Sequence, residues 1–420
     1  MKITPLESWV KQKTGGDLLA YQLEKLNETL AAAQKGPHYC RTLPAHIDSL
    51  TQLSSLPTVD ATTLSQNSAG LVCVPQDEIS RIVTLSTSGS TGTPKRLYFT
   101  QDDQELTVDY FANGLPTVAP VGGTMAILLP CERPGGVGDL IARALERIPV
   151  TPVRHGLISD LKSCVQMLID SKADALVGVP TQVLAAARYC EALDIETKIR
   201  AVLLSTDNIP RIVVSELRRI WGCEVYEHYG MTEMGLGGAI DCDAHDGYHI
   251  RENDLLFEIL DKNGDLLPEG VYGEVAFTTL TRRGMPLVRY RTGDISKIIP
   301  GQCACGSALK RIAPLAGRIG ADVTMASGAI IKMRDFDEVL FSMQCISDFW
   351  LTASPHDNEL KIDVDIKDNF KTPPEAEIKG LLHDSGLIDG LAVHISTALQ
   401  QNTLTQRTGK RGIEVVSQIV

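Results

Sequence analysis

The chain has 420 residues, of which 43% are hydrophobic, and it carries a formal net charge of −12. Because this length exceeds what one core usually supports, we expect a large and a smaller domain. The negative charge argues against nucleic acid or an anionic membrane as the main partner. We find no apolar signal core at the N-terminus and no apolar run long enough to span a bilayer. The ten cysteines stand mostly alone in apolar surroundings, which is typical of a reduced, cytoplasmic protein.

The first hundred residues predict helices and loops. Leucines recur at helical spacing between Asp17 and Gln34 and predict an amphipathic helix. Residues 39–67 predict short helices and loops, and the apolar run 82–85 predicts a buried strand. Thr100 is the expected N-cap of a helix over 103–113.

A segment rich in glycine and hydroxyl side chains follows the strand at 82–85. Gly89 and Gly92 allow a tight turn whose backbone N–H groups can approach an anion, and Lys95 adds a cation. Hydroxyl groups are supplied by Thr87, Ser88, Ser90 and Thr91. These residues predict a polyphosphate-binding loop, although their spacing is not the Walker pattern. A flexible Ser/Gly linker is the alternative.

Strands and helices alternate between residues 124 and 229. Strands are expected at 125–129, 150–153, 175–178, 201–204 and 224–229, and helices at 139–147, 159–171, 213–221 and from a cap at Thr181 to Ala192. This alternation predicts a parallel α/β sheet with a ligand crevice at the carboxyl ends of its strands.

The pattern changes beyond residue 241. Segments 255–260 and 273–279, with an Asn-Gly turn at 263–264, predict antiparallel strands. Beyond residue 318, helices at 335–343 and 374–383 and strands at 349–354, 361–365 and 392–397 predict a small α+β unit. The predicted fold class is α/β: a large N-terminal domain, residues 1–319, has mixed and parallel sheets flanked by helices plus a β-subdomain, and a small α+β domain covers residues 320–420.

Two short motifs offer groups for a nucleotide. At the end of a strand, Tyr229 presents a flat face for a purine, Thr232 a hydroxyl for the α-phosphate and Glu233 a carboxylate for Mg²⁺. Asp294 follows a Gly turn and, when ionised, only accepts hydrogen bonds, which suits two ribose hydroxyls. An incidental strand end and a bare hairpin turn are the alternatives.

Three cysteines and a histidine suit tetrahedral zinc. Cys303 and Cys305 form a tight pair, and Cys242 and His249 form a second pair with six residues between them. With four protein ligands and no open position, such a site would be structural. His245 is a rival for His249, and simple buried thiols are the alternative to any metal.

The loop at 87–95, the Tyr-Gly-x-Thr-Glu of 229–233 and the Tyr-Arg-Thr-Gly-Asp of 290–294 together resemble the AMP-forming acyl- and aryl-CoA synthetase superfamily, in its phenylacetate-CoA ligase branch. The resemblance implies that Gly230 and Asp207 lie along the nucleotide, with Asp207 in place of the usual Glu. It also implies that Arg318 reaches the ribose or phosphate and that the C-terminal domain is mobile about Asp322. Lys410 matches the superfamily's mobile catalytic lysine. Some relatives in this branch carry a zinc knot.

The implied activity is ATP-dependent conversion of a carboxylic acid, preferably an aryl acid, to an acyl-adenylate and then to a CoA thioester. Catalysis would rest on Lys410, Thr232 and Glu233, with ATP, Mg²⁺ and CoA as cofactors and structural Zn²⁺ as a further expectation. Two alternatives stay open: an adenylyltransferase without CoA, like relatives that adenylate a deazaflavin coenzyme, and a non-catalytic nucleotide-binding protein on this fold. We expect small-molecule partners and leave a homodimer open.

Overall fold

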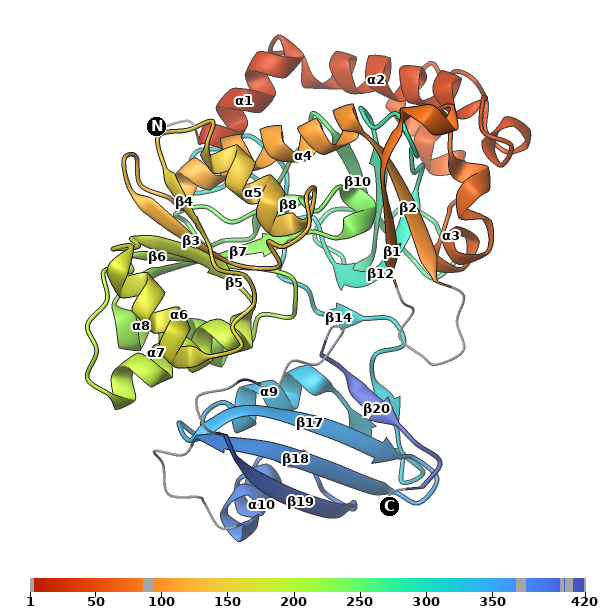
Figure 1. Ribbon diagram of the computed structural model, residues 1–420. Coiled ribbons are helices and arrows are strands. Elements are labelled where there is room, and N and C mark those ends of the chain that lie inside the picture. Colours follow the sequence, from red (N-terminus) through yellow and green to blue (C-terminus); the bar gives the residue numbers. More distant parts are fainter. Residues whose placement is uncertain (1–3, 86–93, 368–374, 401–403, 405–410, 419–420) are drawn as a thin grey trace. The chain divides into compact units, whose positions relative to one another are not determined.

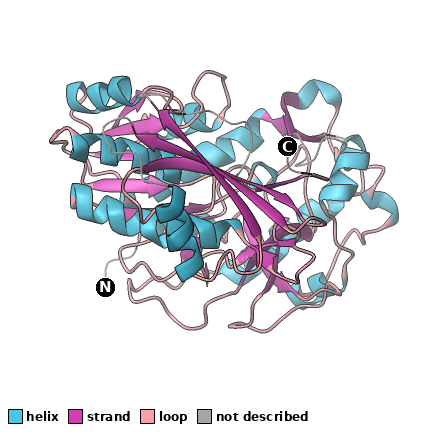
Figure 2. Ribbon diagram, turned by 90° about the horizontal axis from the view of Figure 1, so that it is seen from below, coloured by secondary structure: helices cyan, strands magenta, loops and turns pink. Residues whose placement is uncertain are grey.

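The computed structural model describes residues 4–85, 94–367, 375–400, 404 and 411–418 (Figure 1). The predicted phosphate-loop residues Thr87 to Gly92, and also Lys410, therefore lie outside the described residues. The chain forms two compact units, which are described separately. Unit 1 contains Met1–Val121, Glu132–Val150 and Tyr226–Gly317, and unit 2 contains Gly122–Cys131, Thr151–Val225 and Arg318–Val420. Helices and twisted strands are distributed throughout the described chain (Figure 2).

Unit 1 begins with helices. Its α-helices are α1 (Pro5–Thr14), α2 (Leu18–Ala33), α3 (Ala61–Asn67), α4 (Gln101–Gly114) and α5 (Val137–Leu145). Short 3-10 helices are η1 (Tyr39–Arg41), η2 (Leu50–Ser55), η3 (Ser68–Leu71), η4 (Gln76–Glu78), η5 (Leu115–Thr117) and η6 (Thr232–Met234). As predicted, Thr100 caps α4, in a capping box with Asp103. The short helices expected over 39–67 are also present.

The strands of unit 1 are mainly antiparallel. They are β1 (Ile79–Leu85), β2 (Lys95–Thr100), β8 (Ala239–Ile240), β9 (Tyr248–Ile250), β10 (Leu255–Leu260), β11 (Gly273–Thr279), β12 (Tyr290–Ser296) and β13 (Arg311–Ile312). Strands β10, β11 and β12 lie side by side, and β8 pairs with β9, which pairs with β13. Strands β7 (Glu224–Tyr229) and β14 (Gly317–Arg318) run across the unit boundaries.

The strand expected at 82–85 exists, but the prediction that it is buried is wrong. β1 pairs only with β2 in a two-stranded antiparallel ribbon, and Ile82 is 54% exposed. A ribbon with no further strands covers its side chains on one face at most, so an apolar run does not ensure burial.

Unit 2 combines a parallel sheet with the C-terminal α+β segment. The parallel strands are β3 (Thr124–Leu128), β4 (Thr151–Arg154), β5 (Ala175–Gly178) and β6 (Ala201–Leu204), in the order β6-β5-β3-β4. Helices α6 (Leu161–Asp170), α7 (Pro180–Ala192) and α8 (Arg211–Trp221) follow strands of this sheet. Thr181 does not cap α7: Val179 is the N-cap, and Pro180 takes the first position because proline needs no N–H partner there.

The C-terminal segment supplies the remaining elements of unit 2. They are β15 (Val323–Thr324), β16 (Ile330–Ile331), α9 (Met333–Leu340), β17 (Ile346–Ser354), β18 (Glu359–Lys367), α10 (Glu375–Asp384), β19 (Ala392–Gln400) and β20 (Ile413–Val415). The Glu338 carboxylate accepts from the N–H groups of Arg211 and Ile212 at 2.5 and 2.9 Å, so α9 caps the N-terminus of α8. Buried Arg188 donates to the carbonyls of Phe341 and Ile346 at 2.5 and 3.0 Å.

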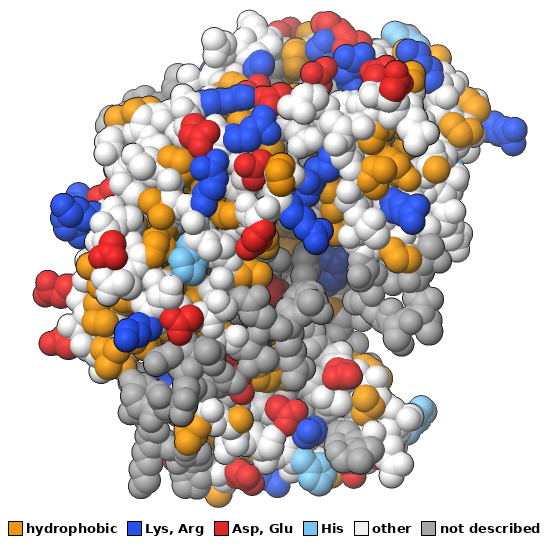
Figure 3. Space-filling view, viewed as in Figure 1, with side chains coloured by type: hydrophobic (Ala, Val, Ile, Leu, Met, Phe, Trp, Pro, Cys, Tyr) orange, Lys and Arg blue, Asp and Glu red, His pale blue; other side chains and the backbone are white. Residues whose placement is uncertain are grey.

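Each unit has its own hydrophobic core. None of the described helices combines the length and apolar character needed to cross a bilayer. On the face shown in Figure 3, acidic and basic side chains are interspersed with hydrophobic ones, and the described residues form no broad basic patch there.

Candidate nucleotide and metal sites

A largely buried ion pair joins two of the predicted site residues in unit 1. Lys95, the first residue of β2, directs its Nζ to Oε1 of Glu233 at 2.6 Å, and the side chains are 12% and 4% exposed. The hydroxyl of Tyr290 also donates to Glu233 Oε1, at 3.4 Å. The structure thus brings the strand that leaves the predicted phosphate loop to the carboxylate predicted to bind Mg²⁺.

Glu233 lies in η6, which follows β7 through a sharp turn. A Cβ on Gly230 would lie 1.9 Å from the carbonyl oxygen of Leu236, so only glycine fits where the turn folds back on itself. The N–H of Leu236 donates to Met231 O at 2.9 Å and closes the turn. Gly230 therefore has a structural role that its predicted place along the nucleotide did not anticipate. Thr232, the first residue of η6, is partly exposed.

Tyr229 and Asp294 form a second buried contact in unit 1. The Tyr229 hydroxyl donates to Oδ2 of Asp294 at 2.9 Å, and the side chains lie on β7 and β12. Gly293, at φ 80°, turns the backbone just before Asp294, whose N–H donates to the Thr292 hydroxyl at 3.0 Å. The two groups predicted to bind the purine and the ribose are therefore direct neighbours.

Three predicted residues lie in unit 2. Asp207 follows β6, and its carboxylate accepts from the N–H of Asn208 at 2.8 Å and from the N–H of Arg411 at 3.2 Å. Arg318 is exposed at the end of β14, and Asp322 is exposed just before β15. The roles of these three residues toward a nucleotide stay predictions.

The four predicted metal ligands come together in unit 1. Ligand atoms of Cys242, His249, Cys303 and Cys305 all lie within 4.8 Å of one another. The register of β8 and β9 pairs Ile240 with His249 and so brings the histidine close to Cys242. The rival His245 turns elsewhere: its Nδ1 contacts Asp241 Oδ2 at 2.6 Å.

The geometry of this cluster fits a tetrahedral metal. The sulfur atoms of Cys242 and Cys303 are 3.7 Å apart, close to the roughly 3.8 Å expected for two thiolates on one tetrahedral Zn²⁺. His249 Nε2 lies 3.3 Å from Cys305 Sγ, while its Nδ1 faces the Leu309 carbonyl at 3.3 Å. That carbonyl orients the ring in the way typical of zinc-binding histidines. Burial lowers the pKa of His249, which favours the neutral imidazole that metals bind.

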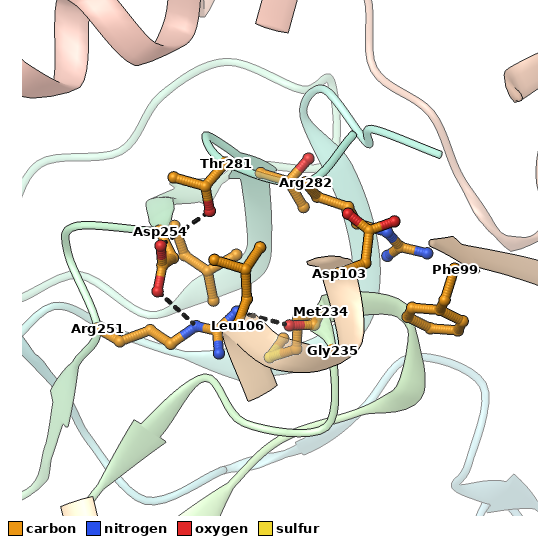
Figure 4. Close-up of a pocket in the computed structure, with 11 residues that line it drawn as sticks. Phe99, Asp103, Leu106, Met234, Gly235, Arg251, Asp254, Thr281 and Arg282 are labelled. Atoms are coloured by element: carbon orange, nitrogen blue, oxygen red, sulfur yellow. Dashed lines mark hydrogen bonds and ion pairs between the residues drawn. The ribbon is translucent and has the colours of Figure 1, made fainter. Parts of the chain in front are cut away.

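Two buried arginines near Glu233 were missed by the sequence reasoning. Arg282 donates from Nη1 to the Glu233 carbonyl at 2.6 Å, and Arg251 donates from Nη2 to the Met234 carbonyl at 3.4 Å. Both line a small pocket with Asp103, Asp254 and the η6 turn (Figure 4). Each arginine stands in an irregular segment without a recognisable motif, and its role depends on contacts between residues distant in sequence.

Comparison with known proteins places the chain in a family. Residues 19–280 match the family model described as AMP-binding enzyme. A phenylacetate-coenzyme A ligase of Aromatoleum evansii is 25% identical over 96% of both chains. A phenylacetate-coenzyme A ligase of Pseudomonas putida is 27% identical over 79% of this chain and 77% of its own. The structure of 2-hydroxyisobutyryl-CoA ligase in complex with 2-HIB-AMP superposes with a TM-score of 0.78 at 20% identity, covering 94% of this chain and 89% of the other.

The structural likeness confirms the predicted α/β fold. The family model spans more than half of the chain and includes Lys95 and Glu233. The chain therefore belongs to the AMP-binding enzyme family, as the motifs at 87–95, 229–233 and 290–294 predicted.

Proposed function

We propose that the protein is an ATP-dependent acid–thiol ligase that converts a carboxylic acid to its CoA thioester through an acyl-adenylate. Family membership and the relatives named phenylacetate-coenzyme A ligase support this activity. The observation that carries the proposal is the buried Lys95–Glu233 pair, which places a cation and a carboxylate where the predicted phosphate loop ends. By analogy with those relatives, an aryl acid is the favoured substrate.

In the first half-reaction, an oxygen of the acid attacks the α-phosphorus of ATP, and the bond to pyrophosphate breaks. Lys95 and the loop from Thr87 to Gly92 would hold the leaving phosphates, and Thr232 the α-phosphate. Glu233 would hold Mg²⁺, which neutralises charge on the phosphates when bound. To do so, Glu233 must exchange part of its contact with Lys95 for the metal.

Recognition of the nucleoside would rest on Tyr229 and Asp294. The hydroxyl of Tyr229 fixes the Asp294 carboxylate at 2.9 Å, and the remaining acceptor capacity of the carboxylate suits the ribose hydroxyls. The ring of Tyr229 offers a face for adenine. This arrangement explains why a tyrosine and an aspartate from distant segments belong to one site.

The C-terminal segment would complete the reaction. We infer that residues 320–420 turn as a mobile domain about Asp322, with Arg318 reaching the ribose or phosphate and Lys410 holding the reacting oxygens. This segment shares one hydrophobic core with the parallel sheet of unit 2, so the turn would have to open contacts such as that of Arg188 with the Phe341 carbonyl. Arg411, which follows Lys410, donates its N–H to Asp207 at 3.2 Å. In the second half-reaction, the CoA sulfur attacks the acyl carbonyl and AMP leaves. Positioning and charge stabilisation account for both steps.

The cluster of Cys242, His249, Cys303 and Cys305 would bind one structural Zn²⁺. Four protein ligands leave no open position for substrate, and the ion would tie the β8–β9 hairpin to the loop before β13. It would contribute stability rather than chemistry. A cytoplasmic location and a homodimer stay predictions.

A screen for pyrophosphate release tests this proposal. Aryl, aliphatic and amino acids are each supplied with Mg·ATP, with and without CoA. Release with at least one acid, together with a CoA thioester, is the expected result. Release without thioester would favour the adenylyltransferase alternative, and no release with any acid would favour the non-catalytic one. Lys410→Ala should lose adenylation yet still convert a supplied acyl-adenylate and CoA to thioester.

A further inference from the structure

Three consecutive carbonyl groups of the turn that carries Glu233 are held by buried donors from other parts of unit 1. The carbonyls of Glu233, Met234 and Gly235 accept, respectively, from Arg282 Nη1 at 2.6 Å, Arg251 Nη2 at 3.4 Å and Thr107 Oγ1 at 2.9 Å. A turn supported only by its own chain would have several conformations open to it. The three donors from other segments restrict the turn to one conformation.

Arg282 has a second attachment, which involves the strand that begins with Lys95. Its Nη2 donates to the Tyr98 carbonyl at 3.3 Å. Its guanidinium carbon Cζ lies over the Phe99 ring, 4.4 Å from the ring centroid. Tyr98 and Phe99 belong to β2, whose first residue is Lys95. The guanidinium of Arg282 therefore connects the backbone of Glu233 to the backbone of β2, the strand that begins with Lys95.

Burying a guanidinium is costly unless it serves several partners. Arg282 is only 6% exposed, and burial lowers the pKa of its guanidinium, although an arginine stays charged. Figure 4 shows its guanidinium at the edge of the pocket, near Asp103 and Phe99. A lysine could replace the charge but not the two divergent N–H donors, which differ in direction and hold different segments.

We propose that Arg282 is a positioning residue, which sets the distance between the Glu233 carboxylate and Lys95 and so prepares the site for a metal-bound triphosphate. The inference rests on the proposed function, in which Glu233 holds Mg²⁺ and Lys95 the phosphates. Arg282 itself touches neither ligand. Its effect passes through the carbonyls of Glu233 and Tyr98, so its loss changes how well the two charged groups act together.

Calorimetric titration with Mg·ATP, and with ATP in EDTA, measures this effect without knowledge of the acid. The variants are Arg282→Lys, Arg282→Gln and a matched control, Arg289→Lys. Arg289 is a buried arginine of the same unit, 3% exposed, that binds Glu258 and the Leu56 and Gly264 carbonyls. Urea unfolding of each variant reports the cost in stability separately from the change in binding.

We expect Arg282→Lys to bind Mg·ATP about tenfold more weakly than the wild type, and Arg282→Gln to bind it more weakly still. Binding of ATP in EDTA should change less, because Glu233 then holds no metal. Arg289→Lys should keep the wild-type affinity for Mg·ATP despite a similar loss of stability. Wild-type affinity in both Arg282 variants, or an equal loss in the control, would overturn the positioning role alone. Absence of Mg·ATP binding by the wild type would overturn the proposed function and the inference with it.

Discussion

The ion pair between Lys95 and Glu233 makes a quantitative prediction about the candidate site. Nζ and Oε1 are 2.6 Å apart, and the side chains are 12% and 4% exposed. With an effective dielectric constant of about 20, the Coulomb attraction at this separation is about 6 kcal/mol. Desolvation of both ions offsets much of this attraction. We therefore expect a net coupling free energy of about 1–3 kcal/mol between the two side chains.

A double-mutant cycle measures that coupling. Lys95→Met and Glu233→Gln should each lower the free energy of unfolding by about 3 kcal/mol, because each leaves the other charge buried without its partner. The double variant removes both charges, so its loss should be smaller than the sum of the two single losses. Urea unfolding of the four proteins, followed by fluorescence, gives the four free energies.

The same variants connect stability with chemistry. Glu233→Gln should slow pyrophosphate release about 10²–10³-fold, as expected when a group that stabilises developing charge is lost. Thioester formation from a supplied acyl-adenylate and CoA should be nearly unchanged, since no pyrophosphate leaves in that step. A coupling below about 0.5 kcal/mol would refute the buried ion pair. Equal loss of both half-reactions would refute the role of Glu233 in adenylation.

Three further predictions concern the metal cluster, a buried cap and a buried lysine. Purified protein should contain one zinc per chain, and Cys305→Ser should lower both the zinc content and the melting temperature; a metal-free wild type would refute the site. The Asp103 carboxylate accepts from three backbone N–H groups at 2.7–3.0 Å. Asp103→Asn should therefore lower the free energy of unfolding, measured in urea, by about 3 kcal/mol. The control Asp102→Asn alters an exposed neighbour and should change this free energy by less than about 0.5 kcal/mol. Burial lowers the pKa of Lys367 from 10.5 to about 7, so between these pH values the unfolded chain binds more protons and stability rises with pH. Lys367→Met should abolish this rise and be the more stable protein at pH 7; parallel pH profiles of the two proteins would contradict the buried lysine.

Local chemistry made much of this protein readable from its sequence. The Asn-Gly turn at 263–264, the Thr100 cap and the alternation of strands and helices over 124–229 depend on neighbours in the chain, and the structure confirms the elements they predicted. The motifs at 229–233 and 290–294 are likewise short continuous segments, the first running from the end of β7 into η6 and the second lying within β12. Their residue types therefore indicated the family before any contact between them was visible.

Contacts between distant segments were decided only by the tertiary structure. Lys95 and Glu233 are 138 positions apart, and each was predicted to contact a ligand rather than the other. Arg282 carries no motif, because its importance comes from two carbonyls on separate segments. The spacing of the histidines allowed either His245 or His249 as the metal ligand. The pairing of β8 with β9 brings His249 to the cysteines, whereas the His245 side chain contacts the Asp241 carboxylate.

Strand β1 shows the same contrast between what the sequence predicts and what the tertiary structure decides. Its apolar residues correctly predicted a strand, because β-branched side chains favour an extended backbone. Whether that strand is buried depends on how many layers cover it, and β2 alone covers little. Sequence determined the type of each element and the chemistry of each motif, since both depend on adjacent residues. The tertiary structure decided which charges, thiols and strands meet, because only packing brings distant residues together.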